Sequence, residues 1–111
     1  MGKSSQATVL PRKVKKNLEQ MGEQIKLARK RRKLSLTKVA ERAQCTQLTL
    51  MRVEKGIPTV SIGIYARILY ALGLDNDLLL IAQKDEAGNA LVNAQIMKRN
   101  AKKEEDDDVF D

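Results

Sequence analysis

Apolar residues recur at intervals of three and four near the N-terminal end of the chain. Four of them form one stripe: Leu18, Met21, Ile25 and Ala28. Residues at these spacings share one face of an α-helix, so the pattern predicts a helix over about residues 14–32. The stretch before it is polar and basic and contains Pro11. We expect residues 1–13 to form a flexible basic arm.

Two shorter apolar patterns follow in SLTKVAERAQCTQLTLMRVEKG, residues 35–56. Ser35 and Thr46 can cap helix N-termini, and Gly56 is typical of the residue that ends a helix. The inward positions are Leu36, Val39, Ala40 and Ala43 in the first helix, and Leu50 and Val53 in the second. Helices this short are unstable alone, so we expect neighbouring helices to support them.

The next apolar stretch predicts a fourth helix that Ser61 caps and Gly73 ends. Its apolar face consists of Ile62, Tyr65, Ala66, Ile68, Leu69 and Leu72. A short fifth helix begins at Asp75 or Asn76 and contains Leu78, Leu79, Leu80 and Ile81. Because no segment alternates like a strand between hairpin turns, the sequence predicts an all-α domain of five helices over residues 14–83.

The remaining segment, residues 84–111, has a weaker pattern. Residues 85–89 are typical of a turn, and 90–97 leave three alternatives open: a short helix, a strand, or a segment that becomes ordered on a partner. From Lys98 the chain is charged, and we expect it to be disordered. Six of the last eight residues are acidic. This acidic end either shields the basic surface, enters a cationic site on a partner, or only increases solubility.

The charge of the chain points to its partner class. The chain has 21 Lys and Arg against 14 Asp and Glu, for a net charge of +7. Residues 1–33 hold 11 of the basic side chains and only two acids. Such a surplus favours nucleic acid or an acidic membrane surface. The basic helix lacks the Trp or Phe residues that flank a membrane-surface helix, so nucleic acid is the better match.

The residue types argue against an enzyme. There is no histidine, and a Gly-rich phosphate loop is missing. Cys45 is the one cysteine, has no basic partner at a recognisable spacing, and is typical of a small buried apolar residue. We therefore expect no cofactor and no metal. The longest apolar block, residues 78–82, is too short to span a membrane, and no secretion signal is visible, so we expect a cytoplasmic protein.

The two short helices match the layout of a helix-turn-helix motif, whose second helix enters the major groove of DNA. On this model the base contacts come from Gln47, Leu48, Thr49 and Arg52, and the phosphate contacts from Ser35, Lys38, Thr46 and Lys55. An amide can bond adenine in two places, and Arg52 contacts either guanine or phosphate. Leu48 and Met51 either touch thymine methyl groups or cover the edge of the core.

The segment MGEQIKLARKRRKLSLTKVAERAQCTQLTLMRVEKG, with VSIGIYARILYALGL after it, resembles the lambda-repressor/Cro (XRE) family over about residues 18–75. The resemblance is carried by Gly22, Ile25, Arg29, Leu34-Ser35, Ala40, Thr46, Leu50, Val53-Glu54, Gly56 and Ala71-Leu72-Gly73. It implies five packed helices, a homodimer on a double-stranded operator with palindromic half-sites, and a structural ion pair between Arg29 and Glu54. Leu36 departs from the family, in which a glutamine follows the serine and grips phosphate or supports the base-reading side chains.

A second resemblance is less specific. The stretches LPRKVKKNLEQMGEQIKLARKRRKLSLTKVAERA and VSIGIYARILYALGLDNDLLLIA, with the basic MKRNAKK after them, resemble HipB-type antitoxins. This resemblance implies a bacterial protein, nucleoid-associated when it is bound to its operator. It would neutralise a HipA-like serine/threonine kinase toxin and repress its own operon. The alternative is a stand-alone XRE-type regulator without a toxin partner.

Overall fold

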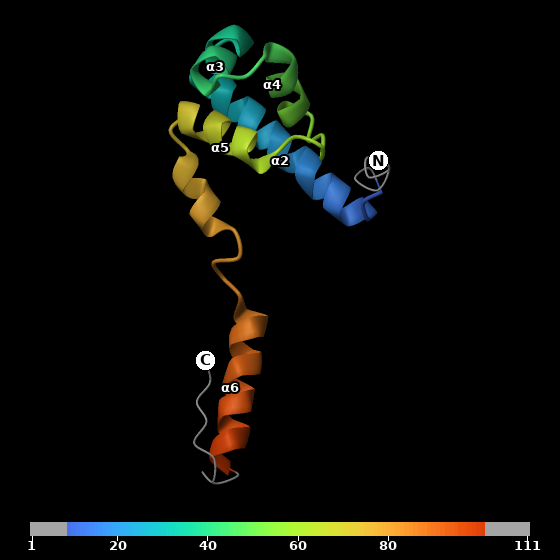
Figure 1. Cartoon of the computed structure of the whole chain (residues 1–111), viewed down its shortest axis with the longest axis vertical. Coiled ribbons are helices and arrows are strands. Elements are labelled where there is room, and N and C mark those ends of the chain that lie inside the picture. Colours follow the sequence, from blue (N-terminus) through green and yellow to red (C-terminus); the bar gives the residue numbers. More distant parts are fainter. Residues whose placement is uncertain (1–8, 102–111) are drawn as a thin grey trace. The chain divides into compact units, whose positions relative to one another are not determined.

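The computed structural model describes residues 9–101, and every regular element in that part of the chain is helical (Figure 1). This confirms the predicted all-α fold. The elements are α2 (Arg12–Arg31), α3 (Leu36–Ala43), α4 (Gln47–Glu54), α5 (Ile62–Ala71), the 3-10 helix η1 (Asp75–Leu80) and α6 (Glu86–Ala101). Within the described residues, no helix is both long enough and apolar enough to cross a membrane. The chain divides after Leu78 into two compact units.

Helix α2 begins two residues before the predicted start. Pro11 occupies the N-cap position with a φ of −56°, and its fixed φ is already suited to starting a helix. Arg12 and Lys13 are therefore helical, which corrects the expectation of a flexible arm through residue 13. The first eight residues of that arm lie outside the described residues. The helix buries four residues against its neighbours: Gly22, Ile25, Ala28 and Arg29.

The two short helices α3 and α4 have the predicted caps. The Ser35 hydroxyl accepts a hydrogen bond from the Lys38 N–H at 3.0 Å, and the Thr46 hydroxyl accepts one from the Thr49 N–H at 3.1 Å. Each bond satisfies one of the N–H groups that a helix start leaves without a partner. The turn between the helices begins at Gln44, which has a left-handed φ of 56°. Asparagine and glycine are the usual residues in that conformation, so the turn carries some backbone strain.

A single core, aliphatic except for Tyr65, joins α2, α3, α4 and α5. Figure 1 shows these four helices packed together. The members of this core come from all four helices: Ile25, Ala28, Val39, Ala40, Ala43, Leu50, Val53, Tyr65, Ile68 and Leu72. Leu50, Ile68, Val39 and Val53 are the largest fully buried side chains. The inward positions predicted for the two short helices are therefore buried, except that Leu36 is half-buried and packs against the edge of the core.

Two glycines allow α2 to approach the end of α4 closely. A Cβ on Gly22 would lie 2.6 Å from the carbonyl oxygen of Val53 and 2.7 Å from that of Glu54. Gly56 has a φ of +76°, and a Cβ there would lie 2.5 Å from the Leu18 carbonyl oxygen. Since these contacts are with backbone atoms, which cannot move aside as a side chain can, only glycine fits at both positions.

The fourth and fifth helices differ in detail from the prediction. Ser61 caps α5 as expected, by accepting a hydrogen bond from the Ile64 N–H at 3.3 Å. Ile62 is the first residue of α5 and does not join its buried apolar face, since it is 69% exposed. The predicted fifth helix is the 3-10 helix η1, and it ends at Leu80, before Ile81.

The C-terminal unit contains the largest correction. Residues 85–89 do not form a turn: Asp85 accepts a hydrogen bond from the Gly88 N–H at 3.0 Å and so caps α6, which begins at Glu86. Of the three alternatives for residues 90–97, the structure shows a helix. Lys98 to Ala101 continue that helix, contrary to the expected disorder. The acidic end, residues 104–111, lies outside the described residues.

Candidate nucleic-acid interface

Helix α4 has one buried face and one exposed face. Leu50 and Val53 are fully buried in the core, and this contact fixes the orientation of the helix. On the other side, Gln47, Leu48, Arg52 and Lys55 are exposed and Thr49 is half-buried. The predicted base-contact residues therefore form one accessible face on α4.

The side chain of Gln47 is held by a residue that sequence reasoning missed. Its Nε2 donates a hydrogen bond to the Thr37 Oγ1 at 2.7 Å. Thr37 lies in the first turn of α3 and Gln47 in the first turn of α4, so this bond joins the two helix starts. The Gln47 side-chain oxygen and its second N–H keep their hydrogen-bonding capacity. The amide is thus oriented and still able to contact a base.

This bond lies next to the departure at Leu36. In the resembled family a glutamine at that position grips phosphate or supports the base-reading side chains. Here Leu36 packs against the core, and the hydroxyl of the next residue, Thr37, supports Gln47 instead. The sequence offered one signal for Thr37. Leu36 is apolar and cannot hydrogen-bond to Gln47, so a neighbouring polar side chain was the candidate for that contact.

Thr46 and Thr49 form a second polar pair on α4. Their hydroxyl oxygens lie 2.9 Å apart in a hydrogen bond that Thr46 donates, while Thr46 also accepts from the Thr49 N–H. The Thr49 hydroxyl is therefore held close to the helix start. Thr49 is half-buried and so is less accessible than Gln47, Leu48 and Arg52.

The predicted phosphate-contact residues fall into two groups. Ser35, Lys38 and Thr46 lie at the starts of α3 and α4, where backbone N–H groups and the helix dipoles favour an anion. Lys55 is at the opposite end of α4. Lys38 and Glu41 form an exposed ion pair at 3.7 Å, which is a weak interaction in water. Lys38 therefore remains accessible to phosphate.

An ion pair between Arg29 and Glu54 holds α2 to the end of α4. The Arg29 Nε donates to Glu54 at 2.7 Å, and a second guanidinium nitrogen donates to the other carboxylate oxygen at 3.1 Å. A third bond, at 3.0 Å, reaches the Leu34 carbonyl in the turn before α3. The bonds to Glu54 raise the pKa of the Arg29 guanidinium, although burial lowers it. Both residues are buried and serve the scaffold, since neither faces outward.

A second arginine, Arg67 on α5, holds the end of α3 and was not predicted. Its Nε donates to the Ala43 carbonyl at 2.9 Å, and another nitrogen donates to the Gln44 carbonyl at 3.4 Å. A cation at these carbonyls also matches the negative end of the helix dipole. Nothing local in the sequence signals this contact, because the partners are 24 and 23 residues apart.

Cys45 lies in the turn between α3 and α4 and is half-buried, so it is more accessible than predicted. Burial raises the pKa of its thiol, while the charge of Arg67 lowers it by a smaller amount. A raised pKa lowers the fraction of the thiol that is present as the reactive thiolate. Among the described residues, no group of three or more His, Cys, Asp or Glu side chains is arranged to hold a metal ion.

Comparison with known proteins agrees with this geometry. The family model described as a helix-turn-helix domain matches residues 20–80, which is more than half of the chain. No curated protein and no solved structure matches the chain. The matched residues run from α2 through η1 and include every residue of the α4 face. The chain therefore belongs to the helix-turn-helix domain family and is a DNA-binding protein.

Proposed function

We propose that this protein is a sequence-specific transcriptional repressor that inserts α4 into the major groove of its operator. The observation that carries the proposal is the two-sided character of α4: buried Leu50 and Val53 behind, and an accessible polar face in front. An α-helix with its side chains is about 10–12 Å in diameter, which suits a major groove about 12 Å wide, and the eight residues of α4 supply about two turns to lie in it. A repressor of this kind blocks transcription by occupying the promoter.

Gln47 and Arg52 are the principal base readers in this proposal. Gln47 is oriented by Thr37 and contacts adenine, and Arg52 contacts guanine or a nearby phosphate. Leu48, which is 55% exposed, is suited to contact a thymine methyl group. Thr49 contributes a hydroxyl beside them. Phosphates on either side bind the capped starts of α3 and α4, with Ser35, Lys38 and Thr46, and the far end of α4, with Lys55.

The proposal is tested by titrating the purified chain and its Arg52→Ala variant with two duplexes. One covers the region upstream of its own gene, and the other has the same composition in shuffled order. We expect the unmodified chain to prefer the first duplex. Loss of one base contact costs about 1–3 kcal/mol, or roughly 5- to 150-fold in affinity for that duplex. A loss that is equal on both duplexes would assign Arg52 to phosphate.

Lys84→Ala is the matched control for charge. It removes one exposed positive side chain between η1 and α6, outside the region that the family model matches. We expect its affinity to change little on either duplex. Equal affinity of the unmodified chain for both duplexes would disprove sequence-specific binding.

The sequence supports a finer proposal, in which this repressor is the antitoxin of a type II toxin-antitoxin operon. Its partner would be a HipA-like serine/threonine kinase, which it neutralises by binding, and the complex would repress its own promoter. The support is the resemblance to HipB-type antitoxins. The alternative is a stand-alone regulator of the same fold.

Two observations separate these alternatives. A kinase reading frame directly beside this gene, and co-purification of a kinase-sized protein when the genes are expressed together, are expected for an antitoxin. Co-expression of this chain with the kinase should also relieve the toxicity of the kinase if the chain is an antitoxin. If the neighbouring genes encode no kinase and no partner co-purifies, the stand-alone regulator is the correct assignment.

A further inference from the structure

Helix α6 has no buried residue among its 16 residues, all of which the structure describes. Leu91 and Met97 are 67% and 70% exposed, and Val92 and Ile96 are also exposed. The helix contains a glycine, three asparagines and two β-branched residues, all of which lower helix stability relative to alanine. An isolated helix of this length and composition is marginal in water. A partner surface on the face that carries Leu91, Ala94 and Met97 would therefore stabilise it; Val92 and Ile96 lie on the opposite face.

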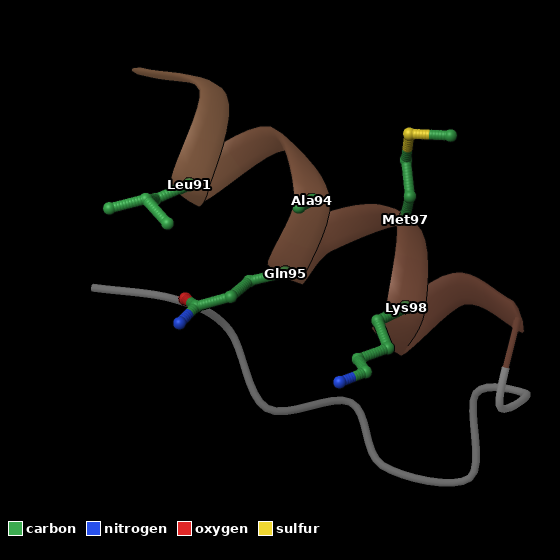
Figure 2. Close-up of a pocket in the computed structure, with 5 residues that line it drawn as sticks. All are labelled: Leu91, Ala94, Gln95, Met97 and Lys98. Carbon is green, nitrogen blue, oxygen red and sulfur yellow. The ribbon is translucent and has the colours of Figure 1, made fainter. Parts of the chain in front are cut away.

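One face of α6 has an apolar pattern that is symmetric about Ala94 except at one pair of positions, where Ala90 lies four residues before it and the charged Lys98 four residues after it. Leu91 lies three residues before Ala94 and Met97 three residues after it, while Ala87 and Ala101 lie seven residues away on either side. At 3.6 residues per turn these positions fall on one face. Figure 2 shows Leu91 and Met97 projecting from the helix, with the short side chain of Ala94 between them. A hollow on α6 is lined by Leu91, Ala94, Gln95, Met97 and Lys98.

This pattern allows α6 to pack against α6 of a second copy that runs antiparallel to it. If two copies cross at Ala94, Leu91 of each lies against Met97 of the other, and Ala87 lies against Ala101. Alanine at the crossing point lets two helix backbones come close, as small residues do elsewhere. A two-fold axis through such a crossing makes the interface self-complementary, as it is in most homodimers.

The charges on α6 favour the antiparallel direction. Acidic Asp85 and Glu86 lie at its start, and basic Lys98 and Arg99 lie in its last turn. An antiparallel pair brings the acidic end of one helix near the basic end of the other. A parallel pair would put like charges side by side, which is destabilising. The opposed helix dipoles of an antiparallel pair add to this preference.

We propose that α6 is a self-association helix, which pairs antiparallel with α6 of a second copy and crosses it at Ala94. The inference deepens the proposed function, because it supplies the dimer that a palindromic operator requires. The pairing itself does not need DNA. Helix pairing and DNA binding can therefore be measured separately, so the failure of one proposal can be told from the failure of the other.

The first test measures the mass of the full chain in solution by light scattering, without DNA. We expect twice the monomer mass of 12.5 kDa. Leu91→Asp introduces a charge into the proposed contact and should give the monomer mass. Ile62→Asp is the matched control, since Ile62 is also an apolar helix residue and is equally exposed at 69%. It should stay dimeric. A monomeric unmodified chain, or a Leu91→Asp variant that remains dimeric, would overturn the proposal.

The second test fixes the direction by disulfide formation in a Cys45→Ser background. A mixture of the Ala87→Cys and Ala101→Cys chains should form a mixed disulfide dimer, whereas each chain alone should not, because only the antiparallel pair brings these positions together. Ala94→Cys alone should also crosslink. Crosslinking of Ala87→Cys with itself would show a parallel pair and overturn the assigned direction. Dimers that form but do not bind the operator would leave this inference standing and disprove the proposed function.

Discussion

At the scale of single residues, Arg29 connects three parts of the motif. It binds both carboxylate oxygens of Glu54 at the end of α4 and the Leu34 carbonyl before α3. Because both members of the ion pair are buried, removing one leaves the other charged and without its partner in a dry site. The pair therefore controls the relative position of the helices more than it adds to their net stability.

We predict that Glu54→Ala lowers the free energy of unfolding by about 3–5 kcal/mol, because the buried Arg29 charge loses its partner. Thermal and urea denaturation measure this change. Glu41→Ala is the control, since its exposed pair with Lys38 is worth about 0–1 kcal/mol. Equal effects of the two substitutions would contradict the role assigned to the buried pair.

Thr37 is a positioning residue for Gln47, and Thr37→Val tests it by removing the hydroxyl while keeping the shape. Loss of this hydrogen bond should cost about 0.5–1.5 kcal/mol in operator binding, or roughly 2- to 13-fold in affinity. Competition titrations should show this loss for the operator and little change for random duplex. Thr59→Val, at an exposed position between α4 and α5, should alter neither. A uniform loss on both duplexes would mean that Thr37 acts on phosphate.

At the scale of elements, the position of α4 depends on how closely α2 passes its C-terminal end. Gly22 and Gly56 allow that close approach. The ion pair between Arg29 and Glu54 then links α2 to α4. Leu50 and Val53 of α4 are buried in the core. The exposed face of α4 is thus oriented by contacts on its opposite side. A substitution at Gly22 should therefore change the orientation of the exposed face of α4, although Gly22 itself is not one of the proposed DNA-contact residues.

We predict that Gly22→Ala destabilises the fold by about 1–3 kcal/mol or more, because the added Cβ meets two backbone carbonyls. Elsewhere in a helix, replacing glycine by alanine stabilises by up to about 1 kcal/mol. Gly63→Ala in α5 provides that control, since its Cβ would meet only the Ser61 hydroxyl at 3.9 Å. Denaturation curves should therefore shift in opposite directions. A stabilised Gly22→Ala chain would show that α2 and α4 are not in such close contact.

At the scale of the whole molecule, charge is distributed unevenly along the chain. Basic side chains gather in residues 1–33 and acidic ones in the last eight residues. The basic side chains attract an anionic ligand such as DNA, whereas the acidic side chains repel it. The alternative in which the acidic end shields the basic surface therefore predicts an effect on DNA affinity, although residues 104–111 lie outside the matched domain.

Removal of residues 104–111 raises the formal net charge from +7 to +13. We predict tighter binding to random duplex at low salt, and a difference that shrinks as salt screens the charges. Fluorescence anisotropy at several KCl concentrations measures both effects. A variant with the acids of that segment replaced by Asn and Gln should behave like the truncated chain. Unchanged affinity at low salt would favour the alternative that the acidic end only increases solubility.

Local patterns in the sequence were sufficient for the fold class and for most helix boundaries. Ser35, Thr46 and Ser61 marked three helix starts, because a capping hydroxyl acts on an N–H two or three residues away. The helical spacing of apolar residues likewise identified Leu50 and Val53 as buried. Where the local pattern was weak, as in residues 85–97, prediction missed both the Asp85 cap and the extent of α6.

The all-α class, the caps of α3, α4 and α5, and the inward positions Leu50 and Val53 of α4 followed from sequence alone, because each depends on neighbours within about one helical turn. Tertiary structure alone decided that Thr37 holds Gln47, that Arg67 binds the end of α3, and that Gly22 meets the backbone of α4. These contacts join residues 10 to more than 30 positions apart. Their geometry follows from how the helices pack, which no local pattern contains.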